Sequence, residues 1–192
     1  MAPFDELEQL VPDRGRILDL GCGNGLFSIH LALASADRRV HGVDISSYKV
    51  RQGRAGAIAA GVAGRVSLEV VDPRWEPAGD VYDVVVMSDV LYLLDPLTIE
   101  RTVVSACRAV KAGGRLIVKE MAVRPRWKHR FALAQEIVAV YLLRITSGGP
   151  LNPDPLTTVV ETLDGAGWLV EPLALDRGYP YSHTAVVAVR GE

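Results

Sequence analysis

The sequence predicts a doubly wound α/β fold: a mostly parallel sheet of seven strands, with one antiparallel strand near the C-terminus and helices on both faces. Short apolar segments alternate along the chain with longer segments of helical periodicity. This alternation predicts parallel strands joined by right-handed crossovers. The chain has 192 residues, 49% apolar and 23% charged, which suits one domain with a substantial core. We therefore treat residues 1–192 as a single domain.

The first half of the chain carries the clearest elements. The predicted strands lie at residues 16–20, 39–44, 66–71 and 82–88, and the predicted helices at 26–36 and 47–60. The first strand runs directly into a glycine cluster. The fourth contains the continuous run Val84-Val85-Val86, which is typical of a strand buried on both faces.

The second half continues the pattern, with one interruption. A helix at 97–110 is expected to stop at Gly113-Gly114, before a fifth strand. The remaining predicted elements are strands at 115–119, 168–175 and 184–189 and a helix at 153–163. The stretch at about 122–155 is an insertion and a candidate substrate cap. If the first closing strand runs parallel and the second antiparallel, their connection lies on the ligand side of the sheet.

Charge and cysteine content exclude several classes of protein. The net charge is −2, which argues against a general electrostatic grip on nucleic acid. The two cysteines, Cys22 and Cys107, have no metal-type spacing, so we expect neither a zinc site nor a disulfide framework. The N-terminus lacks a basic start followed by an apolar run, and no apolar stretch is long enough to span a bilayer. We expect a soluble, cytoplasmic protein.

Glycines and acids stand at the predicted strand ends, where ligands bind in such sheets. The first strand ends in the run Asp19-Leu20-Gly21-Cys22-Gly23-Asn24-Gly25, the second ends in Asp44, and Asp72 follows the third. Glycines let a backbone approach a ligand closely. An acid some 20 residues after the turn can accept hydrogen bonds from ribose hydroxyls. Any one acid could merely cap a helix, but three after successive strands are harder to explain that way.

The run from Ile17 to Gly25 resembles the first motif of the class I S-adenosylmethionine-dependent methyltransferases. Residues 40–46, 70–72 and 82–92 resemble the second, third and fourth motifs, and 111–118 resembles the turn and strand that follow. The resemblance implies S-adenosylmethionine as cofactor and a methyltransferase activity. The cofactor-binding residues that it implies are Asp19, Gly21, Gly23, Gly25, Asp44, Ile45, Asp72 and Ser88.

The resemblance assigns these residues to different parts of the cofactor. Asp19 and the glycine backbone would hold the methionine end, with Ser88 lining the same side. Asp44 would take the ribose, Asp72 would face the adenine amino group, and Ile45 would pack on the ring. One departure from the family pattern is Pro73, which stands where a small apolar residue commonly follows the third acid.

Two alternative functions are an NAD(P)-dependent oxidoreductase and a binding module without transfer activity. An NAD(P)-dependent oxidoreductase would need a glycine at the sixth position of the turn, where Leu26 stands. Asp19 would also place a carboxylate near a pyrophosphate, whereas it suits a ligand ammonium group. A module that binds S-adenosylmethionine without transferring its methyl group stays open.

The methyl acceptor is not named by the sequence. Displacement at a sulfonium requires alignment and exclusion of water, and a general base only if the acceptor must lose a proton. The catalytic candidates are Asp89, Tyr92, Glu120, His129 and His183. We expect a small, partly apolar or lipid-like acceptor, and methylation at oxygen, nitrogen or carbon all stay open.

The insertion begins with the basic stretch 124–130 and continues as an apolar helix at 131–145. Such a helix needs burial on more than one side. It could roof the acceptor pocket, form a homodimer contact or lie at a membrane surface. We expect Trp127, His129 and Phe131 over the methyl group or at the pocket mouth.

Overall fold

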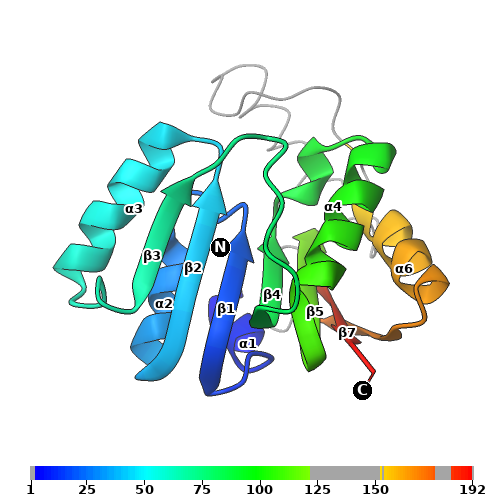
Figure 1. Cartoon of the computed structure of the whole chain (residues 1–192), viewed down its shortest axis with the longest axis horizontal. Helices are drawn as coiled ribbons and strands as arrows, with labels where there is room; N and C mark the ends of the chain where they lie inside the picture. The colour runs from blue at the N-terminus through cyan, green and yellow to red at the C-terminus, as the bar shows by residue number, and fades with distance from the viewer. Residues whose placement is uncertain (1–2, 122–151, 153, 176–182, 192) are drawn as a thin grey trace.

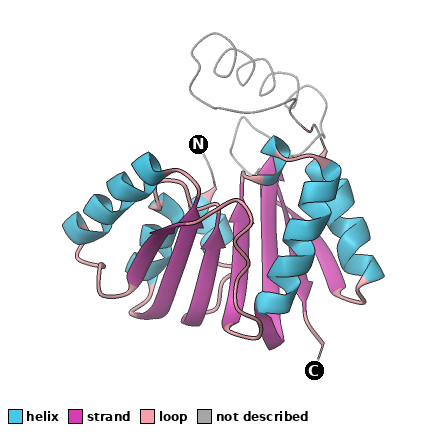
Figure 2. Cartoon of the chain, turned by 45° about the horizontal axis from the view of Figure 1, so that its top comes forward, coloured by secondary structure: helices cyan, strands magenta, loops and turns pink. Residues whose placement is uncertain are grey.

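The computed structural model describes residues 3–121, 152, 154–175 and 183–191. These residues form three layers, in which one sheet lies between two groups of helices (Figure 1, Figure 2). No helix among the described residues is long and apolar enough to cross a membrane.

The sheet has seven strands in the order β3-β2-β1-β4-β5-β7-β6. The strands are β1 (Arg14–Leu20), β2 (Asp37–Asp44), β3 (Val66–Val70), β4 (Tyr82–Ser88), β5 (Val110–Met121), β6 (Leu169–Ala174) and β7 (His183–Val189). Strands β1 to β5 pair in parallel, and β7 is antiparallel to both of its neighbours. The predicted fold class is therefore confirmed, including the single antiparallel strand near the C-terminus.

Helices cover both faces of this sheet. They are α1 (Phe4–Glu8), α2 (Leu26–Ala34), α3 (Ser47–Ala59), α4 (Pro96–Ala109) and α6 (Pro155–Gly165), with a short 3₁₀ helix η1 (Leu91–Leu93). One apolar cluster joins α1, α2 and α3 to one face, and a second joins α4 and α6 to the other. Figure 1 shows α4 and α6 in front of the right half of the sheet. Two helix starts are capped by side chains: Ser46 accepts from Lys49 N, and Asp95 accepts from Thr98 N.

Most predicted elements are confirmed within a few residues, and two features differ. Helix α4 ends at Ala109 and β5 begins at Val110, so Gly113-Gly114 lies inside the strand rather than ahead of it. The reason is that Val110 already pairs with Tyr82, and the register shifts before Val84 pairs with Arg115. Helix α1 was not predicted from the sequence, because its five residues are too few for a periodic signal.

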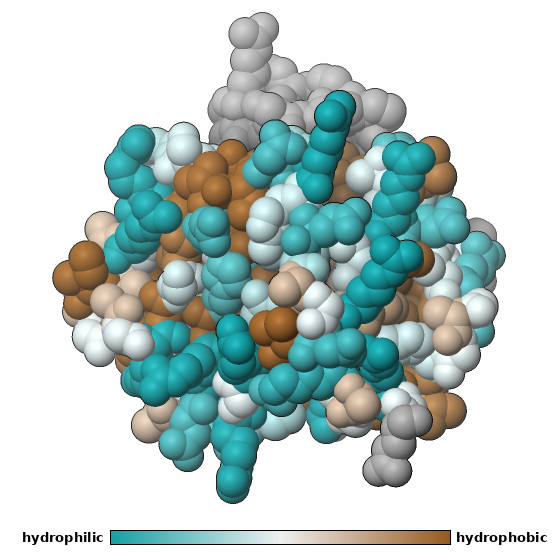
Figure 3. All heavy atoms as spheres, in the orientation of Figure 1, coloured by the Kyte–Doolittle hydropathy of each residue, from teal (hydrophilic) through white to brown (hydrophobic). Residues whose placement is uncertain are grey.

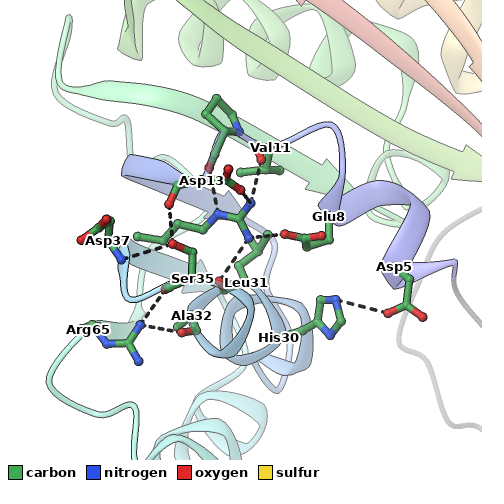
Figure 4. Close-up of polar contacts among 12 residues, drawn as sticks. Asp5, Glu8, Val11, Asp13, His30, Leu31, Ala32, Ser35, Asp37 and Arg65 are labelled. Atoms are coloured by element: carbon green, nitrogen blue, oxygen red, sulfur yellow. Dashed lines mark hydrogen bonds and ion pairs between the residues drawn. The ribbon is translucent and has the colours of Figure 1, made fainter.

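The N-terminal segment is tied to the sheet by the fully buried Arg38 at the start of β2. Its guanidinium donates to Glu8 Oε1 at 2.5 Å, to the carbonyl oxygens of Val11 and Pro12 at 2.7 and 2.8 Å, and to Leu31 O at 3.3 Å (Figure 4). This one side chain therefore joins the segment after α1, the last turn of α2 and β2.

The residue before the predicted insertion and a described residue near its end both lie at the carboxyl edge of the parallel strands. Met121 closes β5, and the N–H of Asn152 donates to Tyr92 O at 2.8 Å, just beyond β4. The predicted helix at 131–145, the roof residues Trp127, His129 and Phe131, and the loop 176–182 lie outside the described residues.

Candidate cofactor and acceptor site

The glycine turn after β1 is packed on one side and open on another. Gly21 N donates to Val43 O at 2.9 Å, which fixes the turn against β2. Gly21 has φ +78°, and a Cβ there would lie 2.6 Å from Val90 Cγ2. Gly23 has φ +57°, and the nearest described atom to a Cβ there is Lys49 Cδ at 3.9 Å. The turn thus needs glycines for its backbone, and it leaves space beside Gly23 for a ligand.

Asp44 at the end of β2 holds this turn in place. Its Oδ2 accepts from Gly23 N at 2.9 Å, and its Oδ1 accepts from Ser46 N at 2.8 Å. A carboxylate oxygen has two lone pairs, so each oxygen keeps one acceptor site for a ligand hydroxyl. The side chain that the sequence assigned to ribose therefore also organises the loop around that position.

Asp19 is a buried acid beside a second acid. It is 3% exposed, near the end of β1, and accepts from Ser28 Oγ at 2.5 Å. Burial raises the pKa of Asp19 to about 6, opposed by the Ser28 hydrogen bond and reinforced by the Asp44 carboxylate. A ligand cation at this place would offset both the burial and the repulsion between the acids. The ammonium group of S-adenosylmethionine meets that requirement, so the two acids fit the cofactor.

The side predicted to take the adenine carries exposed apolar side chains. Ile45 is 65% exposed just after β2, and Val70 is exposed at the end of β3. Figure 3 shows apolar surface over the carboxyl ends of these two strands. Large apolar side chains at a strand end gain free energy when a flat ring covers them.

Asp72 lies near this surface but already has a backbone partner. Val71 N donates to Asp44 O at 3.1 Å, which places Asp72 beside the end of β2. Asp72 is exposed, and its Oδ1 accepts from Arg74 N at 2.8 Å, so part of its role is to close a turn. Its other oxygen stays a predicted partner of the adenine amino group.

The candidate residues for the acceptor pocket lie near the carboxyl ends of β4 and β5. Ser88 ends β4 and pairs in register with Lys119 of β5. Lys119 is fully buried, and its Nζ lies 2.5 Å from Asp89 Oδ2. The sequence predicted Asp89 as a catalytic candidate but not this ion pair, because 30 residues separate Asp89 from Lys119.

Glu120 reaches the same loop from the next position of β5. It is fully buried, and its Oε1 accepts from the N–H groups of Val90 and Leu91 at 2.9 and 2.6 Å. Its Oε2 has no hydrogen-bond partner among the described residues. Burial raises the pKa of Glu120 to about 8, and the nearby Asp89 carboxylate adds to the effect.

Two of the remaining candidates flank these residues, and the third is not described: His183 pairs in register with Met121, next to Glu120, and Tyr92 follows Leu91. His183 begins β7 and is buried, and Leu175 N donates to its carbonyl oxygen at 2.9 Å. Tyr92 is half-buried in η1. His129 lies outside the described residues. Burial raises the pKa of the Cys22 thiol far above its ordinary value, which agrees with a packing role. The described part of the chain holds no group of three side chains suited to a metal ion.

Comparison with known proteins identifies the family of this chain. Residues 17–114, about half of the chain, match the family described as a methyltransferase domain. A ubiquinone biosynthesis O-methyltransferase of Bordetella avium is 34% identical over 137 residues, covering 70% of this chain and 52% of that protein. A 27-O-demethylrifamycin SV methyltransferase of Amycolatopsis mediterranei is 34% identical over 125 residues, covering 63% and 44%. The chain thus spans about half the length of these curated relatives.

A solved structure extends the likeness of the fold beyond the matched segment. Geranyl diphosphate methyltransferase in complex with S-adenosylmethionine superposes with a TM-score of 0.72 at 13% sequence identity. The superposition covers 97% of this chain and 84% of the other. At that identity the likeness concerns the fold alone.

Proposed function

This chain belongs to the class I S-adenosylmethionine-dependent methyltransferases, and from that premise we propose that it transfers the cofactor's methyl group to a hydroxyl oxygen of a small, partly apolar acceptor. Bound S-adenosylmethionine would supply an electrophilic methyl group on a sulfonium. The chain's own residues bind, orient and shield the reactants.

The observation that carries the proposal is the pair of acids around the glycine turn. Asp19 is a buried carboxyl whose pKa is raised to about 6, and Asp44 fixes the turn through Gly23. A cationic ligand favours the ionised form of Asp19, while the free lone pairs of Asp44 suit a ribose diol. An exposed Ile45 completes a surface for the adenine ring. These three features select a ligand that combines a cation, a ribose and a flat base.

Oxygen is the preferred acceptor atom for two reasons. One curated relative described above is named an O-methyltransferase, and the name of the other gives an O-demethylated acceptor. The site also places a partly exposed carboxylate, Asp89, beside Val90, which packs against the glycine turn. A hydroxyl acceptor must lose its proton during transfer, and a carboxylate is a suitable group to receive it. The proposed acceptors include lipid-like molecules that carry a hydroxyl group.

The first experiment measures cofactor binding. We expect S-adenosylhomocysteine to raise the melting temperature and NADH to leave it unchanged. Asp44→Ala should weaken S-adenosylhomocysteine binding by about 1–3 kcal/mol in calorimetry, since it removes a ligand contact and the anchor of Gly23. Asp37→Ala is the matched control, because Asp37 is an exposed acid at the opposite end of the same strand. Equal affinities of the two variants would refute the assigned role of Asp44.

The second experiment measures transfer. Wild-type protein is incubated with methyl-labelled S-adenosylmethionine and a panel of hydroxylated aromatic acceptors, alongside the same compounds with the hydroxyl already methylated. We expect label only in the free hydroxyl compounds. Cofactor binding without any transfer would instead indicate a binding module, and label in the blocked compounds would indicate methylation at carbon or nitrogen.

A further inference from the structure

We propose that Asp89 is the catalytic residue that takes the proton of the acceptor hydroxyl, and that Lys119 and Glu120 of β5 are positioning residues that hold it. This inference rests on the proposed O-methyltransferase function and names the group that would perform its proton transfer.

The backbone of Asp89 has an uncommon conformation. Its φ is +54°, and Asp80 is the other non-glycine residue with positive φ among the residues described. Residues of this kind are sparse outside glycine, and those that persist are held by surrounding contacts. Asp89 is held by its own N–H, which donates to Lys119 O at 2.9 Å, immediately after the end of β4.

The side chain of Asp89 is held at one oxygen and open at the other. Lys119 Nζ lies 2.5 Å from Oδ2, and the lysine side chain is fully buried, whereas the Asp89 side chain is 38% exposed. No described residue donates a hydrogen bond to Oδ1. A buried ammonium is stable only when paired, so the ion pair fixes the direction in which Asp89 points. Oδ1 is left to meet a ligand.

Glu120 fixes the residues that follow. Its Oε1 accepts the N–H groups of Val90 and Leu91, and it projects from β5 on the opposite face from Lys119. Lys119 and Glu120, which are adjacent in β5, therefore hold three consecutive residues, Asp89 to Leu91, by contacts on the two faces of the sheet. Such a two-sided arrangement holds a strained residue in one position.

The segment from Asp89 to Leu91 packs against the glycine turn after β1. A Cβ on Gly21 would lie 2.6 Å from Val90 Cγ2, so the residue next to Asp89 is in direct contact with the turn that binds the methionine end. In addition, Asp19 of β1 pairs with Val86 of β4, two residues before Ser88. Asp89 thus follows the strand next to that of Asp19, three residues beyond the position that pairs with Asp19.

The chemical step balances with the groups named. The acceptor oxygen forms a bond to the methyl carbon, and the carbon–sulfur bond breaks with its electron pair staying on sulfur. The hydroxyl proton passes to Oδ1 of Asp89, which releases it to solvent afterwards. No further reactant is required.

The test compares two acceptors within one variant. Asp89→Asn keeps the shape and can still accept a hydrogen bond from Lys119, but it cannot take a proton. With an ordinary phenol, we expect its turnover to fall by about 10²–10⁴-fold. With a nitro-activated phenol that ionises in water at the assay pH, we expect the loss to stay below about tenfold, because no base is needed. S-adenosylhomocysteine affinity should not change.

A matched control and a second variant test whether the effect is specific to the Asp89 carboxylate. Asp80→Asn alters another aspartate with positive φ (52°) and a 2.5 Å ion pair, to Arg190, but ahead of the first residue of β4, and should leave both rates unchanged. The double variant Asp89→Asn, Lys119→Met removes both charges, so no buried ammonium is left unpaired, and it should show the same dependence on acceptor acidity. Equal losses with both phenols, or no loss, would overturn the role of Asp89 alone. A wild-type protein that binds S-adenosylhomocysteine but methylates neither phenol would overturn the proposed function as well.

Discussion

Glu120 should make the stability of this protein depend on pH, and Glu120→Gln isolates the effect. Glutamine keeps the size of the side chain and an oxygen that can accept from Val90 and Leu91, but it cannot ionise. Burial, followed by the nearby Asp89 carboxylate, raises the pKa of Glu120 from 4.5 to about 8 in the folded protein. That shift corresponds to about 5 kcal/mol at most, at 1.36 kcal/mol for each unit.

The sign follows from proton uptake. In the unfolded chain Glu120 loses its proton near pH 4.5, and in the folded protein near pH 8. Between these values the folded state binds more protons, so the free energy of unfolding falls as pH rises, and the decline ends above pH 8. Glu120→Gln lacks this contribution. Relative to wild type, the variant should therefore gain stability between about pH 4.5 and pH 8.

Urea denaturation at several pH values, followed by tryptophan fluorescence, measures this difference. Other titrating groups, including Asp19, contribute to both proteins and largely cancel in the comparison. Glu171→Gln, at an exposed position of β6, is the control and should give a curve parallel to that of wild type. If Glu120→Gln also runs parallel to wild type over this range, the reasoning about its burial is wrong.

Two further predictions concern the N-terminal anchor and the cofactor turn. Arg38→Met should lower the free energy of unfolding by about 3–5 kcal/mol in urea denaturation, because it leaves Glu8 and several carbonyl oxygens without their buried donor. The neighbouring exposed Arg39→Met should change it by less than about 0.5 kcal/mol, and equal effects would contradict the anchor. Gly21→Ala should weaken S-adenosylhomocysteine binding by about 1–3 kcal/mol, since it strains a backbone with positive φ and overlaps Val90. Gly64→Ala, where a Cβ meets nothing within 4 Å, should leave calorimetric affinity unchanged, and the prediction fails if the two variants bind alike.

The candidate cofactor site could be predicted from the sequence because it is built from local segments. Asp19 lies in β1 directly before the glycine turn, and Asp44 ends the next strand. Parallel strands bring their carboxyl ends to one edge, so the order of elements alone predicts that these residues meet. The sequence could not give the hydrogen bond from Gly23 N to Asp44, which depends on the exact path of the turn.

The N-terminal anchor illustrates what pattern reading misses. Arg38 looks like one of several charged residues near the start of β2, and its neighbours Asp37 and Arg39 are exposed. Its burial arises only because residues 8–13 fold back over the start of β2 and supply acceptors there. A sequence position cannot reveal such acceptors when they come from a segment without periodicity.

By itself, the sequence determined the α/β class, the order of elements and the family, and it predicted which acids would face the cofactor, since each depends on local patterns and on general rules of parallel sheets. Only the tertiary structure decided what Lys119 and Glu120 do. Their burial follows from the register of β5 between β4 and β7, and that register places both beside a loop 30 residues away. Desolvation and pairing between distant charges are properties of the packed molecule, because they depend on which surfaces the fold removes from water.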